Sequence, residues 1–97
     1  MVVLFGDRLK ILGTEIALPI TAETATSVNG ATEVRLIHDE QGNTTHLITI
    51  TDGAVVPTTV ATFSMPPGHV TVIRKLPSEK IYASNDDIRA VSVSYIS

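Results

Sequence analysis

Three histidines, His38, His46 and His69, are the residues of this chain whose type and spacing could do chemistry. Imidazole is the commonest metal ligand in proteins and titrates near neutral pH, so clustered histidines would favour a metal site or acid–base work. His38 and His46 flank the turn "DEQGN" and could face each other across a hairpin. A polar contact between strands is the commoner role of such a pair. The sequence therefore predicts no metal site and no cofactor.

Carboxylates and serines offer the other routes to catalysis. Acid–base chemistry needs two carboxylates, or a histidine and a carboxylate, that converge in a cleft. The adjacent pairs Asp39-Glu40 and Asp86-Asp87 fall in predicted turns, where carboxylates cap backbone amides or face water. The chain has no Gly-x-Ser-x-Gly elbow. We therefore expect a protein without enzymatic activity.

The elements that must position these residues are strands. The chain of 97 residues contains 11 Val, 10 Ile and 13 Thr, whose branched side chains favour the pleated strand over the helix. Alternating segments of four to eight residues recur between turn residues, and no helical apolar stripe is sustained. Seven to nine short strands at this spacing predict a single all-β domain over residues 1–97, an antiparallel β-sandwich of Ig-like or jelly-roll type.

The turn residues predict how neighbouring strands pair. Residues 10–12 and 15–20 are expected to pair around Gly13-Thr14, and "EVRLIHD" is expected to form a hairpin with "THLITIT". Pro66-Pro67-Gly68 is expected to reverse the chain. Residues 21–32 read as a loop with room for one helical turn. Pro57 predicts an edge or irregular strand.

Alternation also predicts which side chains share a face. Val34, Leu36 and His38 should lie on one face of their strand, and His46, Ile48 and Ile50 on one face of theirs. The last strand is expected to turn Val91, Val93 and Tyr95 inward and its serines outward.

Composition excludes several classes of function. The formal net charge of −3 and the scattered basic residues argue against nucleic acid, which requires clustered Lys and Arg. The absence of cysteine excludes disulfides and thiolate metal sites and fits a reducing cytosol. The apolar run "MVVLF" is too short for a signal peptide or a membrane span, so we expect a soluble protein with no membrane partner.

Contacts with other proteins are the remaining candidates. The N-terminal "MVVLF" is either an ordinary core or edge strand or a strand that pairs with a neighbouring subunit. The loop at residues 21–32 and the tip "PPGH" are natural contact points. The pair Arg74-Lys75 would contact an acidic surface, or else remain solvated at the end of its strand. The candidate partner-contact residues are Val2, Val3, Leu4, Phe5, Asn29, Pro67, His69, Arg74 and Lys75.

Sugar binding is an alternative from another class. Sugar-binding β-sandwiches stack sugars on exposed aromatic rings, but this chain has no Trp and only two Phe and two Tyr. Phe63 and Tyr95 lie on faces assigned to the core, so no aromatic platform remains. A glycan-binding module that works through its loops stays an alternative.

A resemblance gives the contact residues a context. The segments "ATEVRLIH", "THLITI", "ATFSMPPGHVTVIRKLPSEKIYAS" and "AVSVSYIS" together resemble small virion proteins of tailed bacteriophages. The resemblance covers about residues 31–97 and consists of strand order and turn chemistry. "MVVLFGDRLKILGTE" has no counterpart in it. The recurring positions are Arg35, Gly68, Arg74, Lys75, Pro77 and Glu79.

This resemblance implies a structural role in the virion. The expected function is a capsid decoration or cement protein, assembled in the host cytoplasm and bound to the major capsid protein on the outer capsid surface. A head–tail connector, tail or baseplate component is the alternative within the virion, and a homo-oligomer is a further expectation. A metal-dependent β-barrel enzyme is the alternative that the histidines would support.

Overall fold

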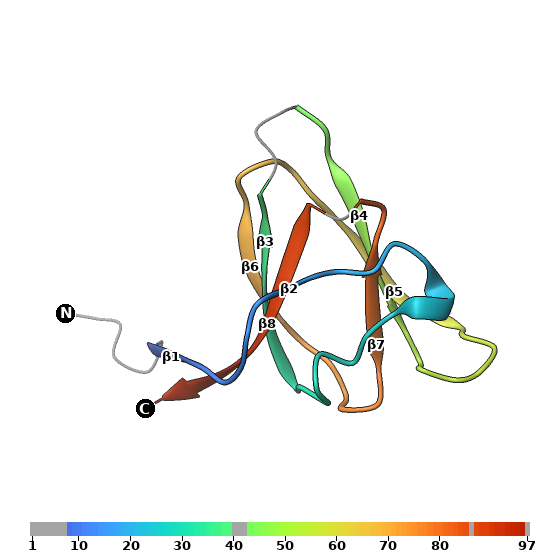
Figure 1. Ribbon diagram of the computed structural model, residues 1–97, viewed down its shortest axis with the longest axis horizontal. Helices are drawn as coiled ribbons and strands as arrows, with labels where there is room; N and C mark the ends of the chain where they lie inside the picture. Colours follow the sequence, from blue (N-terminus) through green and yellow to red (C-terminus); the bar gives the residue numbers. More distant parts are fainter. Residues whose placement is uncertain (1–7, 40–42, 86, 97) are drawn as a thin grey trace.

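The computed structural model describes residues 8–39, 43–85 and 87–96, which form eight strands and one 3-10 turn (Figure 1). All strand pairs among these residues are antiparallel. The elements are β1 (Arg8–Ile11), β2 (Ile16–Ala17), η2 (Ala22–Thr24), β3 (Glu33–His38), β4 (His46–Thr51), β5 (Thr59–Met65), β6 (Val70–Arg74), β7 (Lys80–Ala83) and β8 (Ile88–Ile96).

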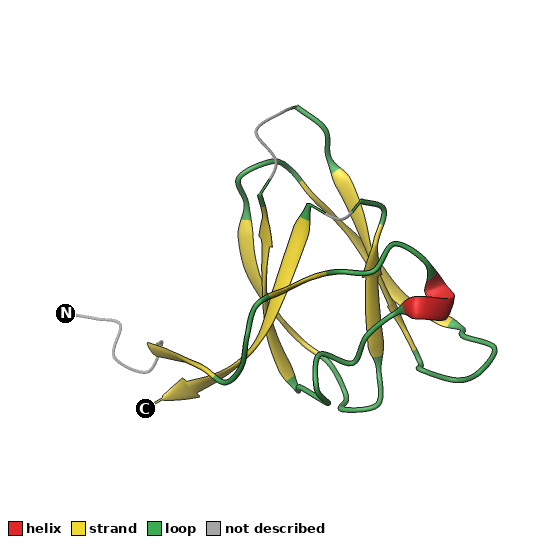
Figure 2. Cartoon of the chain, in the orientation of Figure 1, coloured by secondary structure: helices red, strands yellow, loops and turns green. Residues whose placement is uncertain are grey.

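The strands form two sheets that pack face to face, as Figure 2 shows. One sheet has the order β1-β8-β3-β6, with β2 also paired to β8, and the other has the order β5-β4-β7. The all-β sandwich predicted from the alternating branched residues is confirmed. The single turn expected within residues 21–32 is η2. The edge or irregular strand predicted around Pro57 is not formed, because this residue lies in the loop between β4 and β5.

The core lies between the two sheets. β3 contributes Val34 and Leu36, and β4 contributes Ile48 and Ile50, all at most 7% exposed. Phe63 of β5 packs against this cluster, as its predicted face requires. Burial of about ten such side chains is the main force that holds the two layers together.

The predicted local pairing is wrong in two places. β3 and β4 do not form a hairpin, because β3 pairs with β6 and β8 while β4 pairs with β5 and β7. The turn predicted at Pro66-Pro67-Gly68 is present, with the His69 N–H donating to the Pro66 carbonyl oxygen at 3.3 Å, and it leads from one sheet to the other. β1 and β2 each pair with β8 and not with each other. Strands with one apolar face bury it best against the other layer, so the chain crosses between layers where a hairpin would keep both strands in one.

The predicted orientation of β8 is also wrong. Ser92 lies opposite Val34 in the register, so it shares the core-facing side with Ala90. Val91 and Val93 therefore point to the outer face, although each is only 2% exposed. A period-2 pattern gives two alternating sets but does not say which set faces the core when both contain small or apolar residues.

β8 continues beyond the sandwich. Its first half pairs with β3 as far as Ser92, and residues 93–96 pair with β1. Residues 8–11 and 93–96 thus form a two-stranded ribbon, here called the terminal arm, which points away from the two-layer body (Figure 1). No helix in the part of the chain that the structure describes is long and apolar enough to cross a membrane.

Candidate functional site

His38 and His46 meet at one end of the sandwich. His38 ends β3 and His46 begins β4, so the pair joins the two sheets. Their rings stack with centroids 4.4 Å apart and planes 11° apart, and the residues are 1% and 4% exposed. His38 Nε2 lies 2.9 Å from the carbonyl oxygen of Thr44. This geometry closes the end of the core and leaves neither ring at the surface.

His69 does not complete a cluster with them. Its side chain is exposed, and its link to His38 is through the backbone, where the His38 N–H donates to the His69 carbonyl oxygen at 2.9 Å. Within residues 8–39, 43–85 and 87–96, no group of three His, Asp or Glu side chains could hold a metal ion. The stacked pair is therefore a structural contact in the geometry described.

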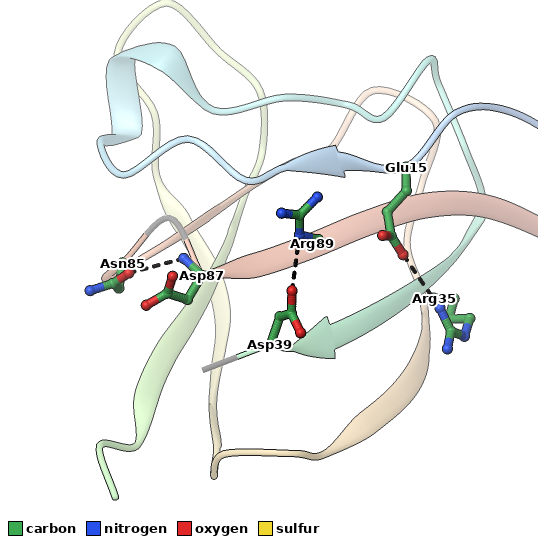
Figure 3. Close-up of polar contacts among 6 residues, drawn as sticks. All are labelled: Glu15, Arg35, Asp39, Asn85, Asp87 and Arg89. Carbon is green, nitrogen blue, oxygen red and sulfur yellow. Dashed lines mark hydrogen bonds and ion pairs between the residues drawn. The ribbon is translucent and has the colours of Figure 1, made fainter. Parts of the chain in front are cut away.

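The acidic residues are engaged in local contacts. Asp39 forms an ion pair with Arg89 at 3.4 Å, and Asn85 Oδ1 accepts the backbone N–H of Asp87 at 2.9 Å (Figure 3). Glu40 and Asp86 lie outside the described residues. The described members of the two acidic pairs, Asp39 and Asp87, thus lie in an exposed ion pair and in a capped turn.

A second ion pair crosses the outer face of the larger sheet. Glu15 lies just before β2 and Arg35 lies on β3, and these two strands flank β8. The two side chains meet across β8, where Arg35 Nη1 is 3.5 Å from Glu15 Oε2 (Figure 3). Val91 is opposite Arg35 in the register, so the pair helps to cover this valine. Both partners are about one-third exposed, so the ion pair contributes at most about 1 kcal/mol to stability.

The predicted contact residues are distributed over separate regions. Asn29 is exposed in a left-handed conformation (φ 58°), near one end of the sandwich. Arg74 is at that end too, with a side chain 83% exposed and 3.4 Å from Glu33. Pro67 and the exposed His69 lie at the opposite end, beside His38. Val2, Val3, Leu4 and Phe5 lie outside the described residues. The predicted contacts that the structure does describe are therefore divided between the two ends of the sandwich.

Lys75 differs from its neighbour Arg74. Lys75 is 7% exposed, and its Nζ donates to the carbonyl oxygen of Leu76 at 3.2 Å. Desolvation lowers the pKa of Lys75, and the carboxylate of Glu79 partly offsets this. Arg74 is therefore a solvated charge at the end of its strand, as one of the two alternatives predicted for this pair. Lys75 is not, because its aliphatic stem packs into the fold.

The segment around Pro57, predicted to be an edge or irregular strand, is instead the loop between β4 and β5. Asp52 closes this loop: its Oδ1 accepts the N–H groups of Ala54 at 3.0 Å and Thr58 at 3.1 Å. The Asp52 N–H donates to the Thr58 carbonyl oxygen at 3.0 Å. Val55 and Val56 at the tip are 100% and 83% exposed. The dipeptide Asp-Gly followed by two valines was the available signal, since Asp side chains cap their own turns.

Acidification is expected to loosen this loop. The N–H groups of Ala54 and Thr58 stabilise the carboxylate and hold the pKa of Asp52 below its ordinary value of 3.8. Because the folded pKa is lowered, the stabilisation is present above about pH 4 and is lost as pH falls through the folded pKa. The amide proton shifts of Ala54 and Thr58, followed by NMR, should move together in that range. In Asp52→Asn, which keeps an oxygen acceptor but cannot titrate, the same shifts should stay constant.

The search for relatives ends without a family. Comparison of the chain with models of known protein families, with curated proteins and with solved structures found no match.

Proposed function

We propose that this chain is a non-enzymatic structural protein of a tailed-bacteriophage virion, a decoration subunit that binds the outer surface of the capsid. The observation that carries the proposal is the terminal arm. A two-stranded ribbon is marginally stable in water unless something packs against it, and this one extends beyond the sandwich from the buried Val93. An arm of this kind suits a subunit that completes its sheet on a neighbour.

The backbone of the arm identifies the edge that would accept a strand. The Leu12 N–H donates to the Ser92 carbonyl oxygen at 2.8 Å, so Leu12 and the alternate residue Lys10 direct their backbone groups toward β8. The N–H and C=O groups of Leu9 and Ile11 therefore point away from β8. Among the described residues, β1 pairs with β8 alone. An extended segment of a capsid subunit could pair with this edge by strand addition.

The turns of the sandwich support a role that depends on rigidity. The Glu79 carboxylate accepts the Leu76 N–H at 2.7 Å, and Ser84 Oγ accepts the Leu47 N–H at 2.9 Å. These bonds order the turn and the strand end where they occur, in a chain without cysteine to form disulfides. A small protein that must hold its surface shape in a lattice benefits from such turns. Repetition over many lattice sites allows a modest interface per copy.

The first experiment measures whether the protein is part of a particle. Virions of the bacteriophage whose genome encodes this chain would be purified. The amount of the protein would then be compared with that of the major capsid protein on a gel. A decoration subunit should be present in a fixed ratio to the capsid protein. A few copies per particle would instead support the connector, tail or baseplate alternative, and absence from the particle would reject the proposal.

Proline at the free edge of the arm provides a residue-level prediction. Ile11→Pro removes an N–H that points away from β8, so the ladder between β1 and β8 keeps its hydrogen bonds. We expect binding to particles that lack the protein to weaken at least about tenfold, the equivalent of about 1.4 kcal/mol. The melting temperature should change little. The matched control is Ile11→Ala, which keeps the N–H and should bind. Equal binding by both variants would show that the edge does not pair.

A further inference from the structure

The tip of the β4–β5 loop is the most exposed apolar feature among the described residues. Val55 and Val56 are adjacent, and they are 100% and 83% exposed. An isolated exposed aliphatic residue is ordinary on a protein surface. Two in sequence at the end of a projecting loop form a small apolar knob, here called the valine tip.

The loop beneath the valine tip is held in one conformation. The three hydrogen bonds between Asp52 and residues 54 and 58 close its base, and the Gly53 N–H donates to Thr51 Oγ1 at 3.2 Å. Gly53 also lies so close to the carbonyl group of Ser78 that no side chain would fit between them. Valine has few rotamers to lose on burial, so little ordering is needed when this tip enters a pocket.

Charged groups flank the valine tip. A hollow of about 260 Å³ opens beside it, between the loop and η2, and Glu23 and Lys80 line it together with Thr51 and Pro57. In the described part of the chain, neither Glu23 nor Lys80 takes part in an ion pair or a side-chain hydrogen bond. A surface that meets the tip would therefore meet one free carboxylate and one free ammonium group.

The tip lies at the other end of the molecule from the arm. In Figure 1, which has the longest axis horizontal, β1 and the end of β8 lie at one end and the loop between β4 and β5 at the other. The longest dimension is 45 Å. A single contact surface that includes both features would have to run along the whole molecule. Two separate partners, one at each end, fit this shape better.

Resting on the function proposed above, we infer that the valine tip inserts into an aliphatic pocket on a second capsid subunit, next to the subunit that pairs with the arm. The chain then bridges two subunits of the lattice. The pocket would carry a basic group at its rim facing Glu23 and an acidic group facing Lys80. Such charges would set the orientation of docking.

Other occupants fit the tip less well. A lipid surface favours basic and aromatic residues around an apolar anchor, whereas Asp52 and Glu23 lie beside this tip and the net charge is −3. Two valine side chains also cover much less than the roughly 1,200 Å² of the smallest stable interfaces, so the tip alone would not hold a free homodimer together. In a lattice, the arm contributes the rest of the binding.

The test replaces the tip and measures binding and particle stability. The double variant Val55→Ser/Val56→Ser should fold with an unchanged melting temperature, because both side chains are exposed. It should bind particles that lack the protein at least tenfold more weakly in co-sedimentation. The wild-type chain is expected to raise the temperature at which the particles break open, and the double variant should not. The matched control is Leu76→Ser, at a 63% exposed leucine in a different turn, which should behave as the wild type.

The outcomes separate this inference from the proposed function. Failure of the wild-type chain to bind particles would reject the proposed function itself. Wild-type binding that the double variant retains in full would overturn the bridge alone. So would a dimer of the free chain, seen by analytical ultracentrifugation and lost in the double variant, since the occupant would then be a second copy. Binding to anionic vesicles that depends on the two valines would assign the tip to a membrane and overturn the inference.

Discussion

Replacing Gly53 with alanine should lower the free energy of unfolding by about 3 kcal/mol. Gly53 has a φ of +77°, where an L-residue is strained, and an added Cβ would overlap the carbonyl oxygen of Ser78. The left-handed conformation accounts for about 1 kcal/mol. The rest comes from displacing the backbone around Ser78, which opens the contact between the β4–β5 loop and the turn before β7. Urea denaturation of the purified chain would measure the loss.

Two other glycines separate these contributions. Gly68 has a similar φ of +79°, but an added Cβ there has no atom within 4 Å. Gly68→Ala should therefore cost only the conformational strain, about 1 kcal/mol. Gly13 has the same open surroundings without the positive φ, so Gly13→Ala should be close to neutral. Equal losses for Gly53→Ala and Gly68→Ala would mean that the approach of Ser78 is not close in solution.

Removing the His38 side chain is the second large effect expected. His38→Ala deletes one of the two stacked rings, leaves a cavity at the end of the core, and takes away the contact with the Thr44 carbonyl oxygen. The cavity in the core, together with the loss of this contact, costs about 3 kcal/mol. In a domain of this size, that loss lowers the melting temperature by more than about 10 °C. Calorimetry at neutral pH would measure it.

His69 provides the matched control. Its side chain is exposed, and its carbonyl oxygen still accepts the His38 N–H after substitution. His69→Ala should change stability by no more than about 0.5 kcal/mol. A loss at His69 as large as at His38 would contradict the separation of the histidines. An increase in melting temperature on adding zinc, abolished by either substitution, would restore the metal hypothesis.

The contact residues were the least predictable part. Adjacent positions in the sequence suggested that Arg74 and Lys75 act together, but Arg74 ends β6 with an exposed side chain, whereas Lys75, directly after the strand, is buried. Val55 and Val56 were predicted to be extended, since a pair of valines before a proline reads as part of a strand, but they form the exposed tip of a loop. Exposure depends on which layer covers a segment, and that is a property of the whole fold.

Local chemistry in the sequence determined several features by itself. The abundance of branched residues and their alternation determined that the chain is all-β. They also placed Leu36 with His38 on one face of a strand and His46 with Ile48 on one face of another, and the structure buries both sets. These features depend on each residue and its near neighbours, and so they can be inferred without a fold.

Only the tertiary structure decided which strands pair, which set of β8 residues faces the core, and where the arm and the valine tip project. Turn residues allow the chain to reverse, but the choice between a hairpin and a crossing to the other sheet depends on how much apolar surface the two layers bury against each other. That energy comes from residues far apart in the chain, such as Val34 and Leu36 in one sheet and Ile48 and Ile81 in the other.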